Sequence, residues 1–181
     1  MLVLISFSAL TLSEPSQAVP AQSQQQEIYM GHLKYEYRNR GRTYLGMAKA
    51  AKWSANSDRG SFFQAYYELE QLNQSIYGPM KSELGVDYQA NWFTRTGLNI
   101  FVYVSWRFVS AQQLVDVIVP YIPKLKEMEA LASPEHKPFF AYVVAQEQAQ
   151  LDATSAALQG DWDSGAKILR EFVEQHQGLK L

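Results

Sequence analysis

The 181-residue chain contains no cysteine, which excludes disulfide bonds and zinc sites with cysteine ligands. Charged residues are also scarce: they make up 19% of the chain, compared with about 25% in typical soluble domains. Hydrophobic residues reach 47% and aromatic residues 13%. This composition argues against general disorder and against a coiled coil, and it supplies enough apolar side chains for one globular core.

Common catalytic motifs are missing as well. The sequence has no Gly-x-Ser-x-Gly, no Gly-x-Gly-x-x-Gly and no phosphate-binding loop, and without cysteine it has no thiol chemistry. Its 16 basic and 18 acidic residues give no dominant positive field, so we expect no nucleic-acid partner. No stretch reaches the roughly 18 consecutive apolar residues of a transmembrane span. These absences favour a binding protein without a cofactor over an enzyme.

The N-terminal region resembles a signal peptide. Residues 1–12 (MLVLISFSALTL) form a short apolar run, and small residues then allow cleavage after Ala18 or Ala21. No basic residue precedes the run, so a buried N-terminal strand or helix is the alternative. We therefore expect a signal peptide over residues 1–21, one all-α domain over residues 22–181, and a periplasmic or secreted protein.

Apolar residues recur at helical intervals along most of the remaining chain. The pattern predicts a helix over residues 26–55, with a break or a close helix contact near Gly41. Ser61 and Gln64 form a capping-box pattern for a second helix, which Gly78 and Pro79 should end.

The middle of the chain is more ambiguous. Residues 98–106 (LNIFVYVSW) have strand propensity, but no comparable partner strand exists, so we expect a buried helix over residues 88–108. Ser110 and Gln113 repeat the capping-box pattern. The helix that they open should break near residues 119–123, where two prolines stand. Its predicted inner face consists of Leu114, Val117, Ile118, Tyr121, Leu125 and Met128.

Local signals are strongest in the last third. Ser133, followed by Pro134 and Glu135, predicts the start of a helix that continues to Gln159. Gly160 and Asp161 then predict a tight turn into a last helix over residues 162–176. The whole pattern predicts an all-α bundle of five or six antiparallel helices.

Charge is unevenly distributed along the chain. Residues 34–59 contain seven basic and two acidic residues, whereas residues 127–181 contain nine acidic and four basic residues. Two interpretations remain open. The segments could lie side by side and neutralise each other, or the basic segment could face an anionic partner with salt-sensitive binding.

Glu147 is the most informative single residue. It interrupts an apolar stripe formed by Phe140, Val143, Val144, Leu151, Thr154 and Leu158. A carboxylate in such a stripe needs a partner, a proton or a metal ion. The structural interpretation is a bond to an arginine or a tyrosine hydroxyl from another helix, and the functional interpretation is a metal site.

Residues 139–176, with YVVAQEQA at 142–149 and LQGD at 158–161, resemble the last two helices of small ferritin-like bundles. That resemblance implies a ferritin-like four-helix core and a carboxylate-bound metal, although Gln146 stands where a histidine would be expected beside Glu147. Di-iron sites need about four acids and two histidines, with Glu-x-x-His pairs that this sequence lacks. The candidate metal ligands are Glu147, Glu70 and Glu36.

We therefore expect an exported helical bundle that acts as a non-enzymatic binding or interaction module for an unknown protein or small molecule. Homo-oligomerisation remains open. The alternative is a degenerate ferritin-like metalloprotein with a site centred on Glu147.

Overall fold

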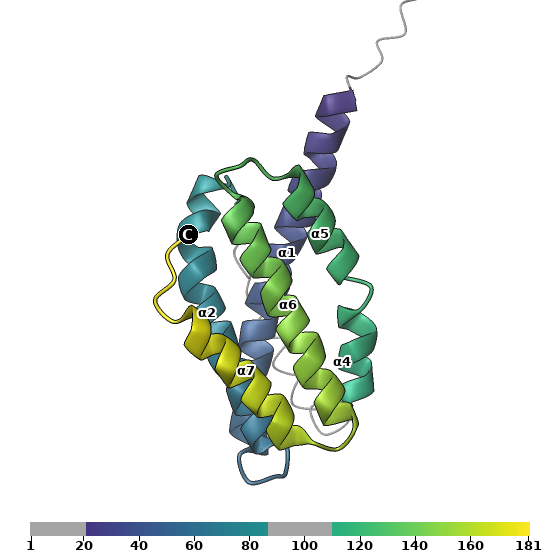
Figure 1. The fold of residues 1–181 in the computed structure, drawn as a ribbon, viewed down its shortest axis with the longest axis vertical. Coiled ribbons are helices and arrows are strands. Elements are labelled where there is room, and N and C mark those ends of the chain that lie inside the picture. The colour runs from purple at the N-terminus through teal and green to yellow at the C-terminus, as the bar shows by residue number, and fades with distance from the viewer. Residues whose placement is uncertain (1–20, 87–109) are drawn as a thin grey trace, which may run out of the picture.

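The computed structural model describes residues 21–86 and 110–181, which form α-helices and no β-strand. The prediction of an all-α bundle is confirmed (Figure 1). The helices are α1 (Ala21–Ser54), α2 (Gly60–Glu83), α4 (Ala111–Ile118), α5 (Ile122–Leu131), α6 (Lys137–Leu158) and α7 (Trp162–His176). The expected signal peptide, apart from its last residue, and the expected helix over residues 88–108 lie outside the described residues, as does the alternative strand at 98–106.

The helices pack around one apolar core. Helix α2 lies against α1 and α7, while α6 lies against α4, α5 and α7. In Figure 1 the first turns of α1 project beyond the other helices. The largest fully buried apolar side chains are Phe62, Phe139, Phe140, Leu33, Leu69, Leu125, Met128 and Leu169. Among the described helices, none is both long enough and apolar enough to cross a membrane.

The start of α2 differs from the prediction. Helix α1 runs without interruption through Gly41, and α2 begins at Gly60 with Arg59 as its N-cap residue. Arg59 makes no capping hydrogen bond through its side chain. The capping box predicted at Ser61 and Gln64 is therefore wrong, because Ser61 already lies inside the first turn of the helix.

The predicted end of α2 is also wrong, because the helix continues through Gly78 and Pro79. Proline in a helix removes a hydrogen bond and strains the preceding turn. Here the neighbouring Tyr77 and Met80 are buried in the core, and this packing outweighs that local cost. The helix ends just before Gly85, whose positive φ of 64° reverses the chain.

Helices α4 and α5 confirm two predictions and correct a third. Ser110 Oγ accepts a hydrogen bond from the backbone N–H of Gln113, and the Gln113 side chain accepts one from the N–H of Ser110, as in a capping box. The break near residues 119–123 is present between the two helices. Val117, however, is 65% exposed and does not belong to an inner face. Within α4 the inner side is formed by Ala111 and Ile118, with Leu114 partly buried, and Val117 lies outside it.

The α6–α7 hairpin follows the predicted turn. Gly160 has a positive φ of 87°, and the Asp161 carboxylate caps α7 by accepting the N–H of Ser164 at 2.9 Å. The start of α6 is wrong by a few residues, because Ser133 lies in a preceding turn and its hydroxyl bonds to the His136 ring. Leu158, predicted on the buried stripe, is exposed.

A glycine allows α7 to approach α6 closely. A Cβ atom added at Gly165 would lie 2.6 Å from the backbone oxygen of Ala153 and about 3.0 Å from the Phe62 ring. Such distances are too short for a side chain without movement of the backbone. This contact holds α7 against α6 and α2.

Candidate functional site: a buried ion network and two adjoining cavities

Arg40 lies at the centre of a buried group of carboxylates from three helices. Glu36 and Arg40 are four residues apart on α1, so both side chains project from the same face. Arg40 Nη1 lies 2.8 Å from Glu70 Oε1 on α2, and Nη2 lies 3.2 Å from Glu147 Oε2 on α6. Arg40 Nε is 3.2 Å from Glu36 Oε1, without hydrogen-bond geometry. One guanidinium thus links three helices through three carboxylates.

Glu36 is bonded further by two phenols. Tyr77 donates a hydrogen bond of 2.7 Å to Oε1, and Tyr121 donates one of 2.6 Å to Oε2. Burial raises the pKa of both tyrosines, so their hydroxyls stay protonated and serve as donors. Glu36 itself is fully buried.

A chain of amides extends the network along α6. Gln146 Oε1 accepts hydrogen bonds from Arg40, Asn73 and Gln150. The Gln146 amide in turn donates to Glu147 Oε2 at 3.0 Å. Tyr66 donates to Gln150 Oε1 at 2.6 Å, and Tyr142 donates to Asn73 Oδ1 at 2.7 Å. Nearly all of these buried polar groups are therefore satisfied, as a folded core requires.

Two of the carboxyls titrate near neutral pH. Burial raises the pKa of Glu70 and that of Glu147 from 4.5 to about 7, although the neighbouring Arg40 acts in the opposite direction. Glu70 Oε2 is fully buried and has no hydrogen-bond partner among the described residues. Near pH 7 the network therefore holds protons, and its negative charge is smaller than that of three full carboxylates.

The structure brings the three predicted residues Glu36, Glu70 and Glu147 together, and it gives them an arginine as their common partner. This matches the structural interpretation of Glu147 as a buried acid bonded to an arginine of another helix. The Arg40 guanidinium therefore lies between the three carboxylates, in the position that a metal ion shared by them would take. Within the described part of the chain, no group of three His, Asp or Glu residues has an arrangement that could hold a metal ion.

Sequence reasoning missed the other half of this network. In the sequence, Arg40 belongs to a basic segment with six other basic residues, and Gln146 stands out only as a departure from a family pattern. A signal for Arg40 was present, because Glu36 stands four residues before it. Gln146 and Gln150 are likewise four residues apart on the buried face of α6. Polar pairs at this spacing inside a hydrophobic pattern indicate such a network.

Glu147 also lines a cavity of about 160 Å³ between α1 and the α4–α5 segment. The other lining residues are Tyr35, Asn39, Val117, Pro120, Tyr121 and Lys124. Arg40 and Gln146 both bond to Glu147 Oε2, and no described residue bonds to Oε1. Among the described residues, the fully buried side-chain atoms without partners are Arg40 Nε and Glu70 Oε2.

A second cavity, of about 260 Å³, adjoins the first and shares Tyr35, Tyr121 and Lys124 with it. Its other lining residues are Gly31, His32, Arg38 and Met128. No Asp or Glu among the described residues lines it. Arg38 lies over the Tyr35 ring at 5.3 Å, and neither Arg38 nor Lys124 forms an ion pair with the described chain. We call this pair of spaces the α1–α5 cavities.

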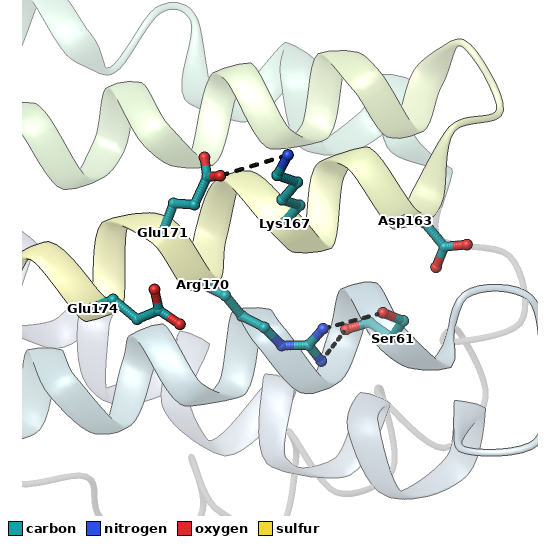
Figure 2. A pocket seen from close by; sticks show the side chains of 6 residues that line it. All are labelled: Ser61, Asp163, Lys167, Arg170, Glu171 and Glu174. Carbon is teal, nitrogen blue, oxygen red and sulfur yellow. Dashed lines mark hydrogen bonds and ion pairs between the residues drawn. The ribbon is translucent and has the colours of Figure 1, made fainter.

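A larger surface pocket, of about 400 Å³, lies along α7 and the start of α2. Figure 2 shows Lys167 paired with Glu171 and Arg170 bonded to Ser61 in this pocket. Lys167 lies 3.7 Å from Glu171, and Arg170 Nη1 lies 3.5 Å from the Ser61 hydroxyl. Arg170 is also paired with Glu68, outside the pocket lining. Both basic side chains among the described residues that line this pocket, Lys167 and Arg170, are therefore paired with an acid.

Comparison of the chain with protein-family models, with curated proteins and with solved structures finds no match in any of the three.

Proposed function

We propose that the protein is a non-enzymatic binding module that takes a small ligand into the α1–α5 cavities. The observation that carries this proposal is Glu147, a buried acid that lines the first cavity and whose Oε1 accepts no bond from the described residues. Polar groups that converge on a concave, partly aromatic space are typical of ligand sites. Tyr35 and Tyr121, whose rings lie 5.5 Å apart, supply the aromatic walls.

The charge distribution supports the same function. Arg40 pairs with Glu147, so the basic and acidic segments neutralise each other at that point. Lys34, Arg38 and Arg42 lie exposed on α1, at spacings of four residues, and form no ion pair with the described chain. This basic face beside the cavities favours the interpretation that it meets an anionic group.

Catalysis has less support from the geometry. The buried carboxylates are held by Arg40, and the tyrosines around them serve as hydrogen-bond donors to protein groups. A ferritin-like metal site centred on Glu147 would require Arg40 to leave its three partners.

Export belongs to the proposal as well. It rests on the apolar run at residues 1–12 and the small residues that follow. Intact-mass measurement on protein from its native host should give a mature chain that begins near Val19 or Gln22. A cytoplasmic protein that retains Met1 would overturn it.

The binding proposal is tested with an aromatic anion, 8-anilinonaphthalene-1-sulfonate, excited directly so that protein fluorescence does not contribute. We expect the dye to gain fluorescence on the wild-type protein. Val117→Trp adds bulk at the rim of the first cavity and should reduce that gain, whereas Leu158→Trp, at an exposed site on the end of α6, should not. Equal binding by both variants, or none by the wild type, would overturn the proposal.

A further inference from the structure

The α1–α5 cavities have their acid in the first space, here called the carboxylate end, and most of their basic side chains in the second, here called the basic end. Glu147 belongs to the first cavity, and it is the only acid among the described residues that line either space. His32 and Arg38 belong to the second cavity, and Lys124 lines both. A ligand that filled both spaces would therefore meet a carboxylate at one end and basic side chains at the other.

The carboxylate end is suited to a hydrogen-bond donor. Glu147 lines the first cavity, its Oε2 accepts bonds from Arg40 and Gln146, and its Oε1 accepts none from the described residues. The buried network contains three carboxylates and one guanidinium, so it can accept a further positive charge. An ammonium group at Oε1 would make a charge-assisted bond in a poorly solvated place, where such bonds are strong.

The basic end is suited to an anion. Arg38 and Lys124 are exposed and have no acidic partner in the described chain, so their charges remain available. His32 is half-buried on α1 and lines the same space. A carboxylate placed here would be attracted by two permanent cations, and the Tyr35 and Tyr121 rings between the two ends would pack on its aliphatic chain.

We propose, on the basis of the binding function above, that the ligand of the α1–α5 cavities is a small zwitterion of the amino-acid class. Its ammonium group bonds to Glu147 Oε1, and its carboxylate lies among His32, Arg38 and Lys124. A ligand with only one of the two charges leaves the opposite end without its partner, and for that reason it binds more weakly.

Matched probes test this assignment by isothermal titration calorimetry on the full domain. The zwitterions are glycine, 4-aminobutanoate and 6-aminohexanoate, which differ in the distance between their charges. Each is compared with the carboxylate and the amine of the same chain length. We expect one zwitterion to bind about tenfold or more tightly than both of its single-charge counterparts. If all three zwitterions bind no more tightly than their matched carboxylates, the assignment is overturned.

Variants locate the two charges. Lys124→Gln should weaken zwitterion binding about tenfold, while Lys126→Gln, an exposed lysine of the same helix that does not line the cavities, should leave it unchanged. Glu147→Gln should weaken the zwitterion and leave the matched carboxylate unaffected. The circular-dichroism spectrum and melting of each variant check that it is folded.

The outcomes separate this inference from the proposed function. If the carboxylate alone binds and depends on Lys124 but not on Glu147, the cavities bind anions and the zwitterion assignment is wrong. If none of the probes binds while the aromatic dye does, the assignment is also wrong and the binding function stands. If neither the probes nor the dye binds, both proposals fail.

Discussion

Two arginine sites in this bundle use the same chemistry in different surroundings. Arg40 and Glu70 are 3% and 0% exposed, with 2.8 Å between their charged atoms. Arg170 and Glu68 are 42% and 34% exposed, with 3.2 Å between theirs. Glu68 and Glu70 belong to the same helix, two residues apart, so their positions on α2 alone determine which one is buried. The two sites therefore differ in hydration: the Arg40 site is shielded from water, whereas the Arg170 site is in contact with it.

We call the Arg40 group the inner site and the Arg170–Glu68 pair the outer site. Because the inner site is shielded from water, a substitution there should lower the free energy of unfolding more than one at the outer site. A buried charge that loses its partner remains without solvation, whereas an exposed charge is solvated again. Arg40 has three carboxylate partners and no water to replace them, while Arg170 faces the solvent and the pocket of Figure 2. Predictions that separate the two sites follow from this contrast.

The largest effect is expected for Arg40→Met. The substitution keeps much of the side-chain volume but leaves three buried carboxyls without their cation. We expect a loss of about 3 to 5 kcal/mol in the free energy of unfolding, measured by urea titration. If the variant is unfolded in the absence of urea, circular dichroism will show it directly. A loss below about 1 kcal/mol would contradict the assigned role of Arg40.

Substitutions of Glu147 should have a smaller effect that depends on the side chain introduced. Glu147→Gln keeps the shape and an acceptor for Arg40, so we expect a change of about 1 to 2 kcal/mol. Glu147→Ala leaves a cavity and also unpairs one of the Arg40 bonds, so its cost should be larger, about 3 kcal/mol. Urea unfolding of the two variants measures the difference. Equal costs would mean that the carboxamide makes no useful bond.

The same protein tests the metal alternative. We expect wild-type protein purified without a metal-chelating tag to be free of iron, manganese and zinc in elemental analysis, and its melting temperature to be unchanged when these metals are added. Near-stoichiometric metal that both Glu147 variants abolish would instead support the metalloprotein interpretation.

Stability should also depend on pH through the inner site. The pKa of Glu70 and that of Glu147 are about 7 in the folded protein, against an ordinary value of 4.5. Between these values the folded state holds more protons than the unfolded state, so unfolding releases protons. The stabilisation from these protonated carboxyls is complete below about pH 4.5 and is lost as the pH rises through about 7.

Unfolding free energies at about pH 5 and about pH 8 measure this dependence. Glu147→Gln removes one of the two titrating groups, so the difference between the two pH values should be smaller in the variant than in the wild type. Exposed groups titrate alike in both proteins and cancel in this comparison. A steeper dependence in the variant would contradict the raised pKa of Glu147.

The fold was predictable where the signal is local. The capping box at Ser110 and the turn at Gly160 and Asp161 need only neighbouring residues, and the structure contains all of them. Ser61 and Ser133 carry similar patterns and do not cap helices. Local chemistry allows a helix to begin at either serine, but the packing of the chain places the first residues of α2 and α6 elsewhere.

The buried network was predictable only in part. Glu147 was recognised because a carboxylate interrupts an apolar stripe, and its predicted partner type is present. Arg40 was not recognised, because it stands among other basic residues and its partner Glu147 is 107 positions away in the sequence. Only the packing of α1 against the rest of the bundle shows which of the basic residues of that segment is buried.

The smallest effect is expected at the outer site. Arg170→Met should cost less than about 1 kcal/mol, because exposed ion pairs gain little and the released Glu68 is solvated again. Salt sharpens the comparison further, since about 1 M ionic strength screens exposed charges and hardly reaches buried ones. We therefore expect the cost of Arg170→Met to vanish in about 1 M sodium chloride while the cost of Arg40→Met persists. Urea unfolding of both variants at low and high salt measures this, and an equal response of the two sites would show that burial does not separate them.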